Sequence, residues 1–251
     1  MRPRPIHKSE AFTLLELTVV IFVIFVVVLF LMSRMHRVSN RAPRIVCVNN
    51  LKQIGTAYRI WANDNGDLFP AEQSMAKGGW REILTNANQG FLCWTNYILM
   101  SNEFGLSPKI LICPSDERQS ADIFSNIVSN TNLSYFVGVS SDDYYPQSIL
   151  SGDRNLAPGT VPGKDYGFSP KTGLGNDIAI QTNSKFDPIC WSQRIHTWNS
   201  LGAGNILLGD GSGQQVTSSG FRINWQPNGG LTTNWPKGHV PWSPSFRVLF
   251  P

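Results

Sequence analysis

The sequence is poor in charged residues. Asp, Glu, Lys and Arg make up 15% of its 251 residues, against roughly 25% in an average soluble protein. Lys and Arg outnumber Asp and Glu by 21 to 17, which gives a formal net charge of +4. An excess this mild lacks the electrostatic signature of a nucleic-acid-binding protein. We therefore expect no nucleic-acid partner.

Cysteine is scarce as well. The four cysteines, which are too few for a fold held mainly by disulfides, are Cys47, Cys93, Cys113 and Cys190. They form no C-x-x-C pair and no Cys/His cluster in the sequence, so the usual spacing of a zinc site is missing. In an oxidising compartment one or two disulfides are possible, and the sequence does not select the pairing. Inert buried thiols are the alternative.

Apolar residues are concentrated in one long run. Residues 12–32 read FTLLELTVVIFVIFVVVLFLM, and only Thr13, Glu16 and Thr18 are polar. As an α-helix the run is about 30 Å long, which matches the thickness of the bilayer core. It is longer than the apolar part of a secretory signal, and no small-residue cleavage site follows it. The sequence predicts a membrane-spanning helix over 12–32 behind a short basic leader, 1–11, and a plain signal anchor is the simplest version.

Glu16 is unusual for a plain anchor. A carboxylate inside a membrane helix costs about 2.5–3.5 kcal/mol on insertion scales, so it is usually paired or functional. The same helical stretch contains no cationic residue, and Lys8 lies in the leader, about two turns earlier. We therefore expect Glu16 to find its partner in another molecule.

The residues around the start of this helix resemble the prepilin signature of the type IV pilin-like proteins, which include the pseudopilins of type II secretion. Residues 8–17 read KSEAFTLLEL: a basic leader, a small residue, Phe, and Glu as the fifth residue from that Phe. The resemblance implies that a prepilin peptidase cuts between Ala11 and Phe12 and methylates the new amine of Phe12. It also implies that Glu16 pairs with the Phe12 amine of a neighbouring subunit. Ala11 stands where the family usually has Gly.

A second helical pattern follows. Apolar residues recur every three or four positions at Val48, Leu51, Ile54, Tyr58 and Trp61. This spacing predicts an amphipathic helix over 43–62 whose apolar stripe packs on a sheet. We interpret residues 33–66 as a helical continuation plus this helix, which Pro43 either opens or kinks. Residues 47–55, CVNNLKQIG, resemble the CxxNLKQIG segment of a pseudopilin-like subgroup found in Planctomycetes and Verrucomicrobia.

Residues 67–251 alternate short apolar runs with Gly, Pro, Asn and Ser, a pattern typical of strands and loops. The runs predicted as strands are 90–100, 109–113, 133–139, 177–180 and 205–208. Asp210-Gly211 predicts a tight hairpin turn. This hairpin and residues 113–116 and 149–155 resemble the same subgroup, whose His nine residues before Asp-Gly is matched loosely by His196 and Asp210.

Two further groups of residues are candidate sites. His196, with Asp210 and the C-terminal tryptophans, is the most enzyme-like group, but no G-x-S-x-G or H-E-x-x-H motif accompanies it. Asp142, Asp143 and Asp153 offer oxygen ligands for calcium, which some pseudopilins bind. Their spacing matches no EF-hand, and Asp in a turn usually bonds to the backbone. Calcium is therefore the one cofactor that we leave open.

Together these features predict an α+β, pilin-like fold. Its long N-terminal helix, half transmembrane and half amphipathic, would pack on a small antiparallel sheet domain with long loops. We expect a structural subunit of a pilus-like filament or pseudopilus, not an enzyme, anchored once in the bacterial inner membrane with residues 67–251 in the periplasm or outside the cell. The implied partners are prepilin peptidase, other pilin-like subunits and the inner-membrane assembly platform. The alternative is a membrane-anchored periplasmic enzyme or ligand-binding module.

Overall fold

The structure, a computed structural model, describes residues 13–39, 42–84, 93–141, 146–169, 172–181, 189–198, 201–220 and 245–251. The chain divides into two compact units, Met1–Ala42 and Pro43–Pro251. Several residues singled out above lie outside the described residues: Ala11, Phe12, Asp142, Asp143, Trp225, Trp235 and Trp242.

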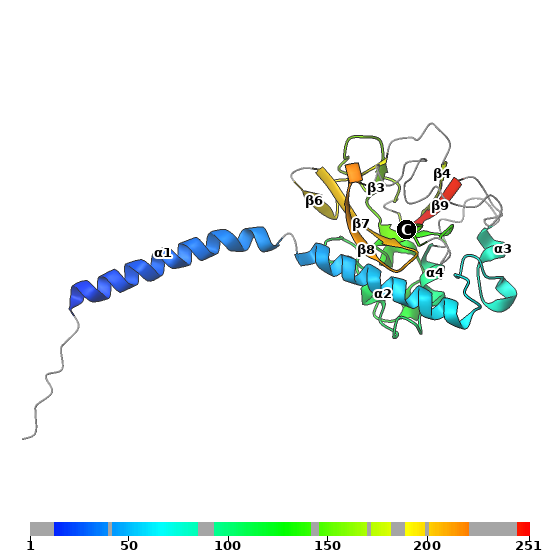
Figure 1. Cartoon of the computed structure of the whole chain (residues 1–251), viewed down its shortest axis with the longest axis horizontal. Helices are drawn as coiled ribbons and strands as arrows, with labels where there is room; N and C mark the ends of the chain where they lie inside the picture. The colour runs from blue at the N-terminus through cyan, green and yellow to red at the C-terminus, as the bar shows by residue number, and fades with distance from the viewer. Residues whose placement is uncertain are drawn as a thin grey trace, which may run out of the picture. The chain divides into compact units, whose positions relative to one another are not determined.

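The first unit contains one helix, α1 (Leu14–Ser39) (Figure 1). Its segment Leu14–Met32 has a mean hydropathy of 3.2, and none of it is buried. Among the described residues it is the helix long and apolar enough to cross a membrane. The prediction of an N-terminal helix of membrane-spanning length is confirmed.

The second unit begins with α2 (Ala42–Asp64). Pro43 lies in the first turn of α2, where its missing N–H costs no helical hydrogen bond, and it opens this helix. The five apolar residues of the predicted stripe are all buried. The helix ends in the predicted turn, where Gly66 and Asp67 adopt positive φ angles of 76° and 60°.

The main sheet has seven strands, all paired antiparallel, so the predicted α+β class with an antiparallel sheet is confirmed. Its strands are β1 (Tyr135–Gly138), β2 (Ile149–Asp153), β4 (Asn176–Gln181), β6 (His196–Trp198), β7 (Leu201–Leu208), β8 (Gly213–Thr217) and β9 (Ser245–Phe250). The order is β4-β9-β1-β2-β7-β6, and β8 also pairs with β7. A second, two-stranded sheet consists of β3 (Leu156–Pro158) and β5 (Ile189–Trp191).

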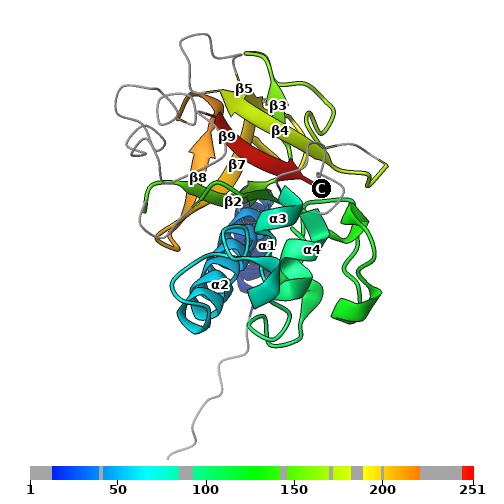
Figure 2. The ribbon, with the colours of Figure 1, turned by 90° about the vertical axis from the view of Figure 1, so that its right-hand side faces the viewer.

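The main sheet is covered on both faces (Figure 2). Along β1, Tyr135 and Val137 join the core beneath α2 and α4 (Cys93–Leu99), whereas Phe136 joins the core shared with β3 and β5. Successive side chains of a strand point to opposite faces. Burial on both sides therefore explains why these strands are continuous apolar runs instead of alternating ones.

Two of the predicted strands are wrong. The run 90–100 contains α4, and 109–113 contains the 3₁₀ helix η3 (Pro108–Leu111). Short apolar runs fit a buried helix as well as a strand. Further short helices are η1 (Met75–Lys77), α3 (Arg81–Leu84), η4 (Phe124–Asn126) and η5 (Asn130–Asn132). The runs at 133–139, 177–180 and 205–208 are strands, as predicted.

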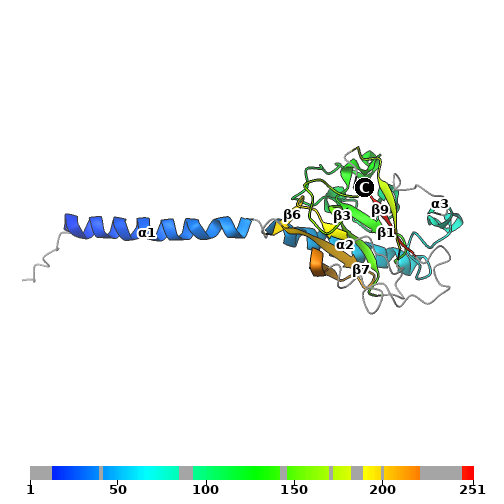
Figure 3. The same cartoon turned by 90° about the horizontal axis from the view of Figure 1, so that it is seen from above.

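A glycine lets α2 approach the β7–β8 hairpin closely (Figure 3). A Cβ atom on Gly55 would lie 2.9 Å from Leu207 Cδ1 and 3.1 Å from Gly211 Cα. Gly211 itself has a φ angle of 81°, as the tight turn requires. The last residue of the CVNNLKQIG segment is thus a packing requirement.

Truncating the buried stripe of α2 should destabilise the second unit. Leu51 is fully buried, whereas Ile60 on the same helix is 45% exposed. We expect Leu51→Ala to lower the free energy of unfolding by about 2–5 kcal/mol, and Ile60→Ala to change it by no more than about 0.5 kcal/mol. Urea unfolding of the full chain in detergent micelles, followed by tryptophan fluorescence, measures both. Equal losses in the two variants would contradict the assigned packing face.

Candidate functional site

Glu16 has a partner within its own helix. Its Oε2 accepts hydrogen bonds from the backbone N–H and the hydroxyl of Thr13, at 2.9 and 2.8 Å, and its own N–H donates to Thr13 Oγ1 at 3.3 Å. This is a reciprocal capping box, which the spacing Thr-x-x-Glu predicts. Both bonds use Oε2, and among the described residues Oε1 has no hydrogen-bond partner.

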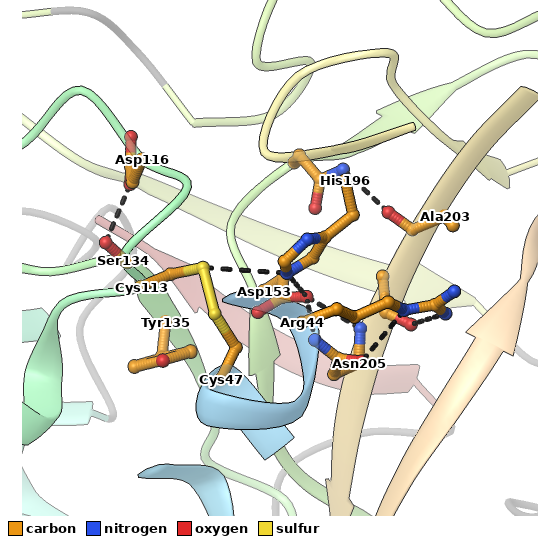
Figure 4. A network of polar contacts seen from close by, with 12 residues as sticks. Arg44, Cys47, Cys113, Asp116, Ser134, Tyr135, Asp153, His196, Ala203 and Asn205 are labelled. Atoms are coloured by element: carbon orange, nitrogen blue, oxygen red, sulfur yellow. Dashed lines mark hydrogen bonds and ion pairs between the residues drawn. A yellow bond between two sulfur atoms is a disulfide. The ribbon is translucent and has the colours of Figure 1, made fainter. Parts of the chain in front are cut away.

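A second group of notable residues lies where α2 meets the sheet (Figure 4). Cys47 of α2 forms a disulfide with Cys113, across a Cα–Cα distance of 5.2 Å and a sequence separation of 66 residues. Both are fully buried. The other two cysteines, Cys93 and Cys190, are buried and take no part in this disulfide. One of the two possible disulfides is therefore present, and it joins α2 to the segment that precedes β1.

His196 and Asp153 lie beside this disulfide. The Nε2 atom of His196 is 3.5 Å from Cys113 Sγ and 3.4 Å from Asp153 Oδ2. Burial lowers the pKa of His196 to about 4 and raises the pKa of Asp153 to about 7, because burial disfavours the charged form of each group. Near neutral pH the imidazole is therefore uncharged, and the two side chains do not form a full ion pair.

Asp153 is anchored by Asn205 of β7. The backbone N–H and the side-chain amide of Asn205 both donate to Asp153 Oδ2, at 2.7 and 2.8 Å. Among the described residues Asp153 Oδ1 has no hydrogen-bond partner, although Asp153 is fully buried. The carboxyl group thus has one oxygen fixed by hydrogen bonds and, among the described residues, one oxygen without any.

Two polar residues of α2 extend the same junction. Arg44 donates to Asn205 Oδ1 at 3.3 Å and to the carbonyl oxygens of Gly204 and Val216 at 3.0 and 3.4 Å. Asn50 Nδ2 donates to the carbonyl oxygen of Ile112 at 3.0 Å and to the Tyr135 hydroxyl at 3.3 Å. The first turns of α2 are therefore bonded to β1, β7 and β8 in addition to the disulfide.

A buried ion pair lies nearby. Arg154 contacts Asp116 with two hydrogen bonds of 2.7 Å, and Ser134 Oγ donates to the same carboxylate at 2.7 Å. The guanidinium carbon of Arg154 lies 3.5 Å from the centre of the Tyr166 ring. Burial raises the pKa of Asp116, but the bonds from Arg154 and Ser134 outweigh it, so the pKa lies below its ordinary value.

The segments that carried the subgroup resemblance therefore meet at one place, which we call the α2 junction. It comprises Arg44, Cys47, Asn50, Cys113, Asp116, Asp153, Arg154, His196 and Asn205. Four segments contribute to it or pack against it: 47–55, 113–116, 149–155 and the β7–β8 hairpin. These four segments thus position α2 on the sheet.

The other candidate site residues have partners of their own. Asp210 is exposed and accepts the backbone N–H of Ser212 at 2.8 Å within its own turn, whereas His196 contacts Asp153. Asp153 contacts N–H groups and the imidazole instead of the oxygen shell that calcium prefers. Trp191 is fully buried in the core, as expected of a core residue.

The chain matches no family model, no curated protein and no solved structure.

Removing the charge of Asp116 should lower the free energy of unfolding more than removing the charge of the adjacent Glu117. Asp116→Asn leaves the buried Arg154 unpaired, and we expect a loss of about 3–5 kcal/mol in the free energy of unfolding. Glu117→Gln, on the adjacent exposed residue, is the matched control. Denaturant unfolding at neutral pH measures both.

The same pair predicts a pH dependence. Because the folded-state pKa of Asp116 is lowered, its contribution is present above the unfolded-state value of about 3.9 and is lost as the pH falls through the folded-state value. Between about pH 5 and about pH 2 the free energy of unfolding should therefore fall less in Asp116→Asn than in the parent chain. Denaturant unfolding at several pH values measures both chains. An equal fall in the two chains would show that the ion pair contributes no such pH dependence.

Proposed function

We propose that the chain is a structural subunit of a type IV pilus-like filament or a type II secretion pseudopilus. It is held in the bacterial inner membrane by α1 and enters the filament after a prepilin peptidase cuts between Ala11 and Phe12. One observation carries the proposal: a helix that is apolar on all sides begins with a carboxylate in its first turn, directly after a prepilin-like cleavage motif.

The apolar surface of α1 requires a cover. From Leu14 to Met32 none of the helix is buried within the chain, and a helix that is apolar all round needs lipid or other apolar helices around it. Lipid tails are about as apolar as leucine side chains, so moving such a helix from lipid into a bundle of identical helices has little hydrophobic cost. This exchange is what assembly of a filament from membrane-bound subunits requires.

Glu16 supplies the register of that assembly. The capping box fixes the carboxylate at the start of α1, with Oε2 bonded to Thr13, and the second oxygen can accept from a neighbour. A newly formed, methylated amine of Phe12 on an adjacent subunit is a cation of the right sign at the right depth. In an apolar surrounding this attraction is much stronger than in water, so it selects one axial offset between helices.

The α2 junction supports a structural role for the second unit. Its disulfide and the hydrogen bonds of Arg44 and Asn50 join α2 to the segment before β1 and to β1, β7 and β8, and its central side chains are buried, His196 being 5% exposed. A filament subunit must carry load from its helix to its globular domain, and a cross-linked helix does so without slipping. The disulfide also fits an oxidising compartment such as the periplasm.

The proposed partners and location follow from the same scheme. The partners are the prepilin peptidase, other copies of the chain, related pilin-like subunits and the inner-membrane assembly platform. The second unit faces the periplasm, or the cell exterior once the subunit is in a filament. The alternative, a membrane-anchored enzyme built on His196 and Asp210, loses its main support because these side chains have different partners.

Substitutions at Glu16 separate the charge from the cap. Gln also serves in a capping box, so Glu16→Gln keeps the helix start and removes only the charge. We expect this variant to be membrane-bound and processed but to assemble at least about tenfold less filament, since a hydrogen bond to a charged group contributes about 1.5–3 kcal/mol. Immunoblots of sheared filaments against processed membrane subunit give the ratio.

Thr13→Ala is the matched control, because it removes both hydrogen bonds of the Thr13 hydroxyl and keeps the carboxylate. It should assemble nearly as the parent chain does, provided that its processing is normal. Normal assembly by Glu16→Gln together with failure of Glu16→Ala would assign Glu16 to helix capping alone and would reject the intermolecular pairing.

A further inference from the structure

The α2 junction brings together four groups that bind soft and borderline metal ions. The Sγ atoms of Cys47 and Cys113 and Nε2 of His196 all lie within 4.8 Å of one another. The carboxyl group of Asp153 is next to the same imidazole, with Oδ2 3.4 Å from Nε2. All four residues are buried. The four residues are far apart in the sequence, so the sequence does not show the short ligand spacing of a typical zinc motif.

The distances fit tetrahedral zinc. Bond lengths of about 2.3 Å to sulfur and about 2.0–2.2 Å to nitrogen or oxygen put neighbouring N and S ligands about 3.6 Å apart, and N and O ligands about 3.4 Å apart. In the structure, Nε2 of His196 is 3.5 Å from Cys113 Sγ and 3.4 Å from Asp153 Oδ2. Two thiolates on one zinc ion are not bonded to each other, so the ion can enter only when the disulfide is broken.

We propose that the reduced chain binds one Zn²⁺ through Cys47, Cys113, His196 and Asp153, and that the zinc ion and the disulfide are alternative cross-links between α2 and the sheet. A dithiol reductant gives two electrons and two protons to the Cys47–Cys113 disulfide and is itself oxidised to a disulfide. The chain then holds two thiols. Zinc displaces both thiol protons, forms two Zn–S bonds, and takes a lone pair from His196 Nε2 and another from a carboxylate oxygen of Asp153.

The surroundings support each ligand. Asn205 holds Oδ2 of Asp153 with two N–H groups, while Oδ1 has no hydrogen-bond partner among the described residues. Ligating carboxylates are commonly oriented by such outer hydrogen bonds. With two thiolates and one carboxylate, the loaded site carries a single net negative charge, and the guanidinium of Arg44, bonded to Asn205 Oδ1 at 3.3 Å, lies close enough to offset it.

The backbone before His196 is strained in a way that fits a ligand position. Ile195 adopts a φ angle of 60°, and the His196 N–H donates to the Arg194 carbonyl oxygen at 2.6 Å across it. A β-branched residue in this region of backbone conformation is strained and is kept where the surroundings over-determine it. The tight turn directs the imidazole toward the sulfur atoms (Figure 4).

The test uses the full chain in detergent micelles with Cys93→Ala and Cys190→Ala, so that Cys47 and Cys113 are its only cysteines. After anaerobic reduction with a phosphine, Co²⁺ is titrated as a spectroscopic probe. We expect one Co²⁺ per chain, with a thiolate-to-cobalt charge-transfer band, intense tetrahedral d–d bands, and loss of both on addition of Zn²⁺. The oxidised chain should bind none.

Ligand variants and X-ray absorption identify the site. His196→Ala and Asp153→Asn should each weaken Co²⁺ binding at least about tenfold, whereas Asp210→Asn, the matched carboxylate outside the junction, should not. Zinc-edge absorption of the loaded chain should show sulfur at about 2.3 Å together with nitrogen or oxygen at about 2.0–2.1 Å, and this measurement needs no ligand variant.

Several results would overturn the proposal. These are absence of tetrahedral cobalt bands from the reduced chain, equal binding by the oxidised chain, undiminished binding by His196→Ala, or a zinc shell without sulfur. If reduction alone unfolds the second unit, zinc must restore its native circular dichroism, since metal binding and folding are coupled in such sites. Failure to restore it also counts against the proposal.

Discussion

The contact between α2 and the sheet is the constraint on which the second unit depends. One face of the sheet has its core completed by the apolar stripe of α2, and the Cys47–Cys113 disulfide closes a loop of 66 residues there. A loop of this length corresponds to about 4 kcal/mol in the chain-entropy description, a large share of the roughly 5–15 kcal/mol that stabilises a typical domain. Arg44 and Asn50 of α2 add polar contacts that fix the position of the helix.

The two units place opposite demands on their surroundings. The second unit has two clusters of buried apolar residues, one on either side of its main sheet. The apolar stretch of α1 buries none and relies on lipid or on other helices. Such a division suits a subunit that is stored in a membrane and used in an assembly, because one part stays folded while the other changes its neighbours. The capped carboxylate of Glu16 lies at the start of this apolar helix.

Local signals predicted local structure well. The stripe of α2 repeats over several turns, and the β7–β8 turn needs only Asp210-Gly211, so both were accessible from the sequence. Thr13 and Glu16 also have the spacing of a capping box, a signal that could have identified the partner of Glu16. Short runs such as the one that forms α4 were not decidable, because helix and strand fit them equally. The α2 junction could not be predicted from the sequence, because its residues have no regular spacing there. The register of the sheet and the crossings of the chain bring them together: Cys47, Cys113, Asp153, His196 and Asn205.

The central claim is that the chain is a processed subunit whose α1 assembles with copies of itself. Intact-protein mass spectrometry of the chain purified from its native membrane tests this most directly. If the chain is processed as proposed, the mature species begins at Phe12 and carries one added methyl group on the new amine. A mature species that retains Ala11 and the residues before it would rule out this processing.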